Sequence, residues 1–175
     1  SFQLSELVYG ECSFLGFIFQ QPNILPWYTV RQNVALPLRV FGLKGPEWDS
    51  RVDELLEMVG LKEYAGAHPN EISGGMLQRA GVIRAMVHDP EILLMDEPFG
   101  ALDEMTREQM NMELLEIWEK TGKTIIFITH NIEEAVYLGQ RIMILTNKPT
   151  TVKETVDNNM PRPRDIAAPE FIDLR

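Results

Sequence analysis

The sequence has a single cysteine, Cys12, among its 175 residues, which excludes a disulfide within the chain. One thiol is typical of a reducing compartment, and we interpret Cys12 as a small buried side chain rather than a reactive group. No apolar run approaches the roughly 20 residues that are needed to cross a bilayer. The first residues also lack the basic and apolar regions of a signal peptide. These absences predict a cytoplasmic protein.

Positive charge is also scarce. Acidic residues number 26 against 16 lysines and arginines, which gives a net charge of −10. Proteins that bind nucleic acid usually present a basic face, so the composition predicts no nucleic-acid partner. Hydrophobic residues make up 45% and charged residues 24%, as in ordinary soluble domains, and the length suits one domain with a sizeable core.

Apolar runs and amphipathic patterns alternate along the chain. Strands are predicted at 14–20, 91–96, 124–129 and 141–146. Helices are predicted at 30–41 with a break or kink at Pro37, from a cap at Asp49 or Ser50 to 59, and at 76–88, 105–120 and 132–138. The alternation after residue 90 predicts an α/β fold with a parallel sheet, and the mostly helical stretch 30–88 reads as an inserted subdomain. We expect irregular structure after Lys148, with 160–164 as an extended surface segment.

Two adjacent acids, Asp96 and Glu97, end the apolar run 91–96. Adjacent side chains at the end of a strand project to opposite sides, so one acid can hold Mg²⁺ while its neighbour polarises a water. Taken alone, the pair fits solvated loop residues equally well. The polar residues Gln20 and His130 also follow predicted strands, and alone each carries little weight.

A Ser-Gly-Gly segment (Ser73, Gly74 and Gly75) precedes a predicted helix. Exposed backbone N–H groups and the helix dipole make such a segment an anion site. The same three residues also form a good helix cap and turn, which is the more common role for an isolated example. The segment alone therefore does not establish phosphate binding.

The order and spacing of these elements resemble the nucleotide-binding subunit of ATP-binding cassette (ABC) transporters. The resemblance covers residues from about 16 to 175 and rests on the segments Phe19-Gln20, 72–79, 93–98, 100–103 and Thr129-His130. Further residues, in 25–34 and 161–164, resemble the nitrate, sulfonate and taurine import branch. The resemblance implies a P-loop NTPase-like α/β fold of the ABC ATPase type, with parallel sheet and inserted helical subdomain. It divides the chain into four segments: a first-strand region at 1–29, the helical subdomain at 30–88, the core at 89–158 and a C-terminal tail at 159–175.

The resemblance also implies roles for single residues. Gln20 matches the glutamine that contacts Mg²⁺ and the attacking water, Asp96 the aspartate on Mg²⁺, and Glu97 the catalytic base. His130 matches the histidine near the γ-phosphate. Ser73, Gly74 and Gly75 match the signature motif, which contacts the ATP held by the opposite subunit, and Asp103 the residue at the dimer interface.

The implied activity is ATP hydrolysis that drives uptake of a nitrate-, sulfonate- or taurine-like solute. Implied partners are a membrane permease at residues 21–34, a second ATPase subunit or a homodimer, and indirectly a solute-binding protein. The implied location is the inner face of the cell membrane.

One part of the family pattern is missing. The chain has no glycine-rich phosphate loop of the form Gly-x-x-x-x-Gly-Lys-Ser/Thr. We therefore expect an N-terminally truncated cassette, inactive alone, in which cis binding of ATP is very weak. In the family the missing strand lies between those predicted at 124–129 and 141–146, so a gap in the sheet is expected.

Two further functions stay open. Alternatively, the chain is a non-catalytic interaction module that complements a full-length subunit in trans or docks to a permease. A DNA-maintenance ATPase is disfavoured by the acidic charge and the lack of heptads.

Overall fold

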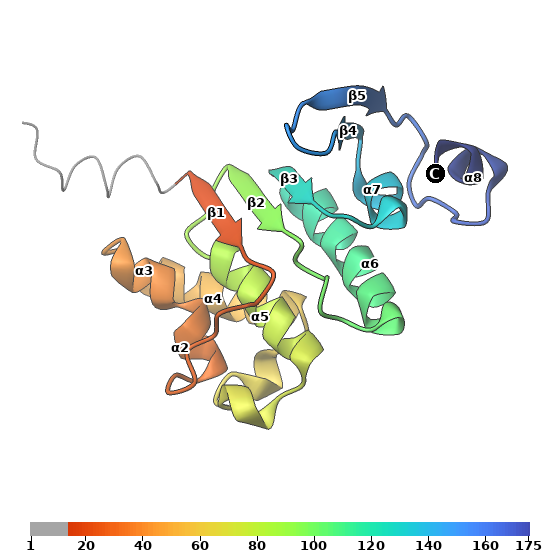
Figure 1. Ribbon diagram of the computed structural model, residues 1–175. Helices are drawn as coiled ribbons and strands as arrows, with labels where there is room; N and C mark the ends of the chain where they lie inside the picture. Colours follow the sequence, from red (N-terminus) through yellow and green to blue (C-terminus); the bar gives the residue numbers. More distant parts are fainter. Residues whose placement is uncertain (1–13) are drawn as a thin grey trace, which may run out of the picture. The chain divides into compact units, whose positions relative to one another are not determined.

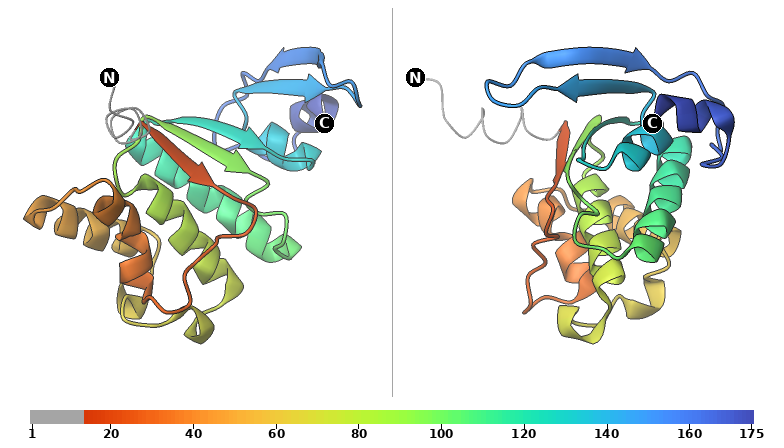
Figure 2. Two further views of the ribbon diagram at one scale, coloured as in Figure 1. Left: turned by 60° about the vertical axis from the view of Figure 1, so that its left-hand side comes forward. Right: turned by 45° about the vertical axis from the view of Figure 1, so that its right-hand side comes forward.

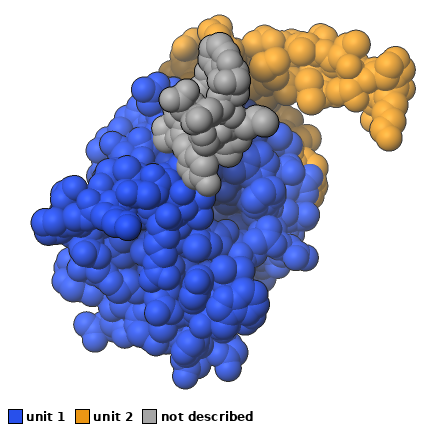
Figure 3. Space-filling view, turned by 90° about the vertical axis from the view of Figure 1, so that its left-hand side faces the viewer, with its two compact units in different colours: residues 1–128 blue, residues 129–175 orange. Residues whose placement is uncertain are grey.

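The computed structural model describes residues 14–175, which form two compact units that meet in sequence between Ile128 and Thr129 (Figure 3). The first predicted strand, 14–20, therefore lies entirely within the described residues. Cys12 lies outside them. Within residues 14–175, no helix is both long enough and apolar enough to span a membrane.

The first unit is built on a three-stranded parallel sheet in the order β1-β2-β3 (Figure 1). Its strands are β1 (Leu15–Ile18), β2 (Ile92–Asp96) and β3 (Thr124–Ile128). Leu94, at the centre of β2, pairs with Phe17 on one side and Ile126 on the other. All three strands therefore end at the same edge of the sheet, which places Asp96 and the residues after each strand together. The predicted parallel α/β fold is confirmed.

Helices cover one face of this sheet. Figure 2 shows α5 and α6 running along it, and the strand residues on that side, such as Leu93 and Met95, are fully buried. On the opposite side Phe17 and Ile126 remain 38% and 51% exposed. The helices of the unit are α2 (Val30–Val34), α3 (Leu36–Val40), α4 (Pro46–Met58), α5 (Gly74–Met86) and α6 (Glu104–Thr121), with 3₁₀ turns at Lys62–Tyr64 and Pro69–Glu71.

Helix α5 lies at the centre of the unit. It packs against β1, α2, α3, α4 and α6, and its residues 80–83, 85 and 86 are buried. A helix that is apolar on most sides is stable only inside a protein. The Ser-Gly-Gly segment is therefore attached to the most firmly packed helix of the unit.

The second unit contains α7 (Ile132–Leu138), the strands β4 (Arg141–Leu145) and β5 (Val152–Asp157), and α8 (Pro169–Leu174). The two strands form an antiparallel hairpin with an irregularity between Ile144 and Leu145. The predicted strand at 141–146 is confirmed as β4, and it pairs with β5. The irregular structure expected after Lys148 is wrong, since β5 and α8 lie there.

The break expected near Pro37 in the helix 30–41 is confirmed: two helices meet at Ala35, and Pro37 lies in the first turn of α3. Two smaller expectations are corrected. Helix α4 begins at Pro46 rather than after a cap at Asp49 or Ser50, because proline is well placed in a first turn. The segment 160–164 is not a surface segment throughout, since Arg164 is only 6% exposed.

Candidate functional site

The carboxyl edge of the sheet brings Gln20 and Glu97 together. Gln20 follows β1 by two residues and Glu97 follows β2 directly, next to Asp96. The amide nitrogen Nε2 of Gln20 donates a hydrogen bond of 3.5 Å to Oε2 of Glu97. Two segments that are 77 residues apart in sequence therefore present an amide and two carboxylates at one edge, where ligands of parallel α/β sheets bind.

Glu97 is held in an uncommon backbone conformation. Its φ of 42° lies in the left-handed region, which costs a non-glycine residue about 1–2 kcal/mol. The surrounding chain fixes it there, because its N–H donates to the carbonyl of Ile128 at 2.9 Å and its carbonyl accepts from Gly100 at 3.1 Å. A strained residue that its surroundings hold in place is typical of functional sites.

Gly100 leaves room for this arrangement. A Cβ atom at Gly100 would lie 3.3 Å from Nε2 of Gln20 and 3.5 Å from Oε2 of Glu97. A Cβ atom at this position would press on the amide of Gln20 and lie in ordinary contact with the carboxylate of Glu97. The glycine of the segment 100–103 is therefore part of the site.

The chemistry of this edge suits Mg²⁺. A carboxylate and an amide oxygen are the hard ligands that Mg²⁺ takes, usually one or two from the protein and the rest from water and phosphates. Asp96 offers the carboxylate and Gln20 the amide oxygen, since the amide nitrogen of Gln20 is engaged with Glu97. Within residues 14–175 no group of three or more His, Cys, Asp and Glu side chains forms an all-protein metal cage.

The Ser-Gly-Gly segment forms the N-terminus of α5. The Ser73 hydroxyl caps the helix by accepting from the N–H of Met76 at 3.3 Å. Ser73 and Gly74 are exposed, and a Cβ atom at Gly74 would meet nothing within 4 Å. The start of this 13-residue helix is therefore open at Gly74, where no neighbouring side chain lies within 4 Å of a Cβ position.

The N-terminus of α6 lies next to that of α5. A Cβ atom at Gly75 would be 3.2 Å from Cγ2 of Thr106, which lies in the first turn of α6. Asp103 caps α6 by accepting from the N–H of Thr106 at 3.1 Å and from its hydroxyl at 2.7 Å. These hydrogen bonds from Thr106 lower the pKa of Asp103 below its usual range. Asp103 is thus a charged residue beside the Ser-Gly-Gly segment.

His130 belongs to the second unit and is exposed. Its neighbours on both sides build the start of α7. The N–H of Asn131 donates to the Thr129 hydroxyl at 2.9 Å, and Oδ1 of Asn131 accepts from the N–H of Glu133 at 2.8 Å. The backbone around His130 is therefore fixed by a turn and a helix cap.

Residues 122–124 read Gly-Lys-Thr but do not form a phosphate loop. Gly122 closes α6 with a φ of 62°, and the residues precede a strand instead of following one. Nζ of Lys123 donates hydrogen bonds to Oδ1 of Asp89 at 2.8 Å and to the carbonyl of Pro90 at 2.5 Å. This lysine stabilises the loop before β2, at the amino ends of the strands.

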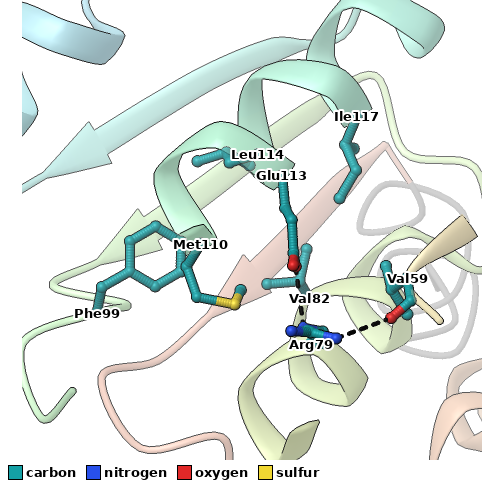
Figure 4. A pocket seen from close by; sticks show the side chains of 8 residues that line it. All are labelled: Val59, Arg79, Val82, Phe99, Met110, Glu113, Leu114 and Ile117. Carbon is teal, nitrogen blue, oxygen red and sulfur yellow. Dashed lines mark hydrogen bonds and ion pairs between the residues drawn. The ribbon is translucent and has the colours of Figure 1, made fainter. Parts of the chain in front are cut away.

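A small apolar pocket lies between α5 and α6, away from the predicted site residues (Figure 4). Within it Nε of Arg79 pairs with Oε2 of Glu113 at 2.9 Å, and Nη1 of Arg79 donates to the carbonyl of Val59 at 3.3 Å. The pocket contains none of Gln20, Asp96 or Glu97, and we interpret it as a packing seam. Its lining residues are Val59, Arg79, Val82, Phe99, Met110, Glu113, Leu114 and Ile117.

The segment 21–34 is held by hydrogen bonds of a buried side chain and presents one exposed aromatic side chain. Asn33 is fully buried, and its side chain makes four hydrogen bonds of 2.8–3.1 Å to the backbone of residues 25, 28 and 29. Trp27 is 67% exposed. The guanidinium of Arg39 lies 5.6 Å from the ring centroid of Tyr28. The loop is therefore ordered and presents apolar surface.

A family model described as ABC transporter matches residues 13–100, just over half of the chain. This chain belongs to the ABC transporter family. Among solved structures, the ATP-binding cassette MJ0796, as a dimer in a post-hydrolysis state bound to ADP and Pi, matches with a TM-score of 0.72 and 35% identity. The match covers 90% of this chain and 68% of that one.

Two curated relatives within the ABC family are similar in sequence. The taurine import ATP-binding protein TauB of Rhizobium johnstonii is 49% identical over 168 residues, covering 91% of this chain and 64% of the relative. The aliphatic sulfonates import ATP-binding protein SsuB of Bacillus subtilis is 46% identical over 160 residues, covering 91% and 62%. The chain thus spans a little under two thirds of the length of these relatives.

Two residues that bear on the site were missed at the level of sequence. Gln78 is 3% exposed, and its amide donates to the carbonyl of Pro98. Arg84 donates to the carbonyls of Pro22 at 2.5 Å and Asn23 at 2.9 Å, just after Gln20. The available signal was weak: both are polar residues on a helix whose other side chains are mostly apolar.

Proposed function

We propose that this chain is the ATP-binding component of an ABC importer that takes up a sulfonate- or taurine-like solute. The observation that carries the proposal is the contact of Gln20 with Glu97 beside Asp96, at the carboxyl edge of a parallel sheet. The names of the relatives, which import taurine or aliphatic sulfonates, support the solute class. The ADP-bound dimer of MJ0796 supports nucleotide binding between two subunits.

The proposed chemistry is phosphoryl transfer to water by positioning. Asp96 and Gln20 would hold Mg²⁺, and the bound ion would supply neutralisation of charge on the phosphates. Glu97 accepts a proton from the attacking water through its carboxylate, and Gln20 orients that carboxylate through the 3.5 Å hydrogen bond. For His130 we propose the role near the γ-phosphate that its match to the family histidine implies. A fixed geometry is the main requirement for such catalysis, which agrees with the restrained turn at Glu97.

The proposed role of the Ser-Gly-Gly segment lies in the partner's site. Ser73, Gly74 and Gly75 contact the γ-phosphate of ATP that the second ATPase subunit holds, and Asp103 lies at the interface of the two subunits. The exposure of Ser73 and Gly74 at the start of α5 supports this role. Residues 21–34 receive the membrane permease, which supports a peripheral location at the cytoplasmic face, and a solute-binding protein acts indirectly. In this scheme 30–88 is the helical subdomain and 89–158 the catalytic core.

A non-catalytic interaction module is the second candidate. It is favoured by the combination of an intact, open start of α5 with the lack of a phosphate loop in these 175 residues. Without the backbone cradle and lysine of that loop, the β- and γ-phosphates lose their main ligands. On either proposal, this chain alone binds ATP very weakly.

ATP affinity and turnover of the chain alone, and after addition of a family subunit with a phosphate loop, test the proposal. We expect neither tight binding nor turnover from the chain alone, and turnover above the subunit's own rate after mixing. Turnover by the chain alone that Glu97→Gln abolishes, but the exposed control Glu108→Gln does not, would sink the claim that it is inactive alone. Silence in every mixture would refute the ATPase role.

A further inference from the structure

The turn that follows β2 needs support from outside itself. Glu97 holds a left-handed φ of 42°, which an ordinary residue adopts only where the surroundings impose it. The local hydrogen bonds, from Gly100 to Glu97 and from Leu102 to Phe99, are both 3.1 Å long and lie within the turn. They close the turn, and the N–H of Glu97 ties its start to the carbonyl of Ile128 in β3 at 2.9 Å. A second anchor, on the side of the helices, holds the carbonyl of the next residue.

Gln78 on α5 is that anchor. Its side chain is 3% exposed, and a buried amide is stable only where it is hydrogen-bonded. Nε2 of Gln78 donates to the carbonyl of Pro98, the residue directly after Glu97. The contact joins α5 to the turn across 20 residues of sequence.

The same helix also holds the loop after β1. Arg84 donates to the carbonyls of Pro22 and Asn23, and a Cβ atom at Gly81 would lie 3.0 Å from Cβ of Pro22. Helix α5 therefore contacts both the loop after β1 and the turn after β2. The side chains of these two segments meet in the contact between Gln20 and Glu97. Its N-terminus is the Ser-Gly-Gly segment, about one helical turn before Gln78.

We propose that Gln78 is a positioning residue: through the Pro98 carbonyl it ties the helix that starts at the Ser-Gly-Gly segment to the turn that holds Glu97. An anion that engages the start of α5 is thereby sensed at Glu97, and through it at Gln20. The signalling part of this inference rests on the proposed function. The anchoring part rests on the contacts alone.

Amide hydrogen exchange of this chain tests the anchoring part. Gln78→Met keeps the volume of the side chain but removes the donor, which leaves the buried Pro98 carbonyl unpaired. We expect exchange of the Gly100 and Leu102 amides to rise roughly 5- to 50-fold, the effect of losing one buried hydrogen bond. Two controls separate this effect from general loosening: Val82→Ala destabilises α5 elsewhere, and Gln109→Met removes an exposed glutamine contact.

A selective rise in Gln78→Met supports the inference. An unchanged turn, or an equal rise in Val82→Ala at matched global stability, overturns it. The signalling part is tested by mixing the chain with a phosphate-loop subunit and ATP. The turn should become more protected in the wild type and not in Gln78→Met. If both respond alike, the signalling is refuted. If neither responds and no mixture hydrolyses ATP, the proposed function fails, while the exchange result on the chain alone still decides the anchor.

Discussion

His88 shows how one buried side chain sets the response of the first unit to acid. It is 9% exposed, its Nε2 lies 3.3 Å from the carbonyl of Leu15, and its Nδ1 has no partner. Burial lowers the pKa of His88, and the nearby charges of Lys123 and Arg51 lower it further. The imidazole is therefore neutral in the folded protein over a wider pH range than in the unfolded chain.

The pH dependence follows from that difference. As the pH falls below about 6.5 the unfolded chain takes up a proton at this position before the folded protein does, so stability is lost from there downward. The loss should be no steeper than about 1.4 kcal/mol per pH unit. Chemical denaturation between pH 8 and 5 measures it. His88→Gln keeps a donor for Leu15 and should flatten the profile, whereas His68→Gln should not. An unaltered slope in His88→Gln would contradict this account.

The sequence singled out the candidate residues at the carboxyl edge but not the residues that support them. Asp96 and Glu97 stood out because an apolar run ends at two acids, whereas Gln20 was singled out by the family resemblance. Gln78 was not identifiable, because a glutamine in a helix is usually solvated. Its burial depends on the position of Pro98, which only the folded chain defines.

At the scale of elements, the end of α7 is held by an arginine rather than by a glycine cap. Nη1 of Arg164 donates to the carbonyls of Val136, Tyr137 and Gly139 at 2.8–2.9 Å. Nη2 donates to the carbonyl of Asn158 at 3.3 Å. These carbonyls at the end of a helix lack partners within it, so a buried guanidinium satisfies several of them at once.

Arg164→Met should therefore destabilise the second unit. Loss of several hydrogen bonds from one charged donor should cost about 2 kcal/mol or more in the free energy of unfolding, although the carbonyl of Val136 keeps its hydrogen bond from Nδ2 of Asn158 at 2.8 Å. The matched control is Arg141→Met, which removes an ion pair with Asp157 whose side chains are 70% and 61% exposed. Such an exposed pair contributes little to stability. Denaturant unfolding monitored on residues 129–175 compares the two, and equal losses would refute the role of Arg164.

The elements that the sequence missed are those with a mixed pattern. Strand β5 carries Lys153 and Glu154 between apolar residues, so it has no clear strand signal, and it forms because β4 offers it a partner. Helix α8 has six residues and no side-chain cap. Its formation depends on packing of Phe171, which is 1% exposed.

At the scale of the whole molecule, the parallel sheet was predictable from apolar runs that alternate with helices. Its extent was not. The strand at 141–145 has the composition of a core strand but pairs in a separate hairpin. Among the described residues, no strand pairs with the edge of β3 opposite β2. Within residues 14–175 this edge of β3 is thus unpaired, and Ile126 and Ile128 of the strand are about half exposed.

We propose above all that this chain contributes to ATP hydrolysis through its Ser-Gly-Gly segment, in a site whose phosphate loop belongs to the partner. Two substitutions distinguish the contributions. Gly74→Glu places an acid at the start of α5, where a Cβ atom meets nothing within 4 Å, so folding should be unaffected. Gly66→Glu, at another open glycine, is the control. Glu97→Gln removes the proposed base of the chain's own site.

The decisive measurement is ATP turnover after mixing this chain with a phosphate-loop subunit of the family whose own Ser-Gly-Gly segment has been inactivated. We predict that the mixture hydrolyses ATP. Gly74→Glu should lower the rate on the order of 100-fold, because it places a negative charge next to the γ-phosphate. Glu97→Gln and Gly66→Glu should leave the rate unchanged. A mixture that Glu97→Gln silences, or that Gly74→Glu leaves active, would contradict the account.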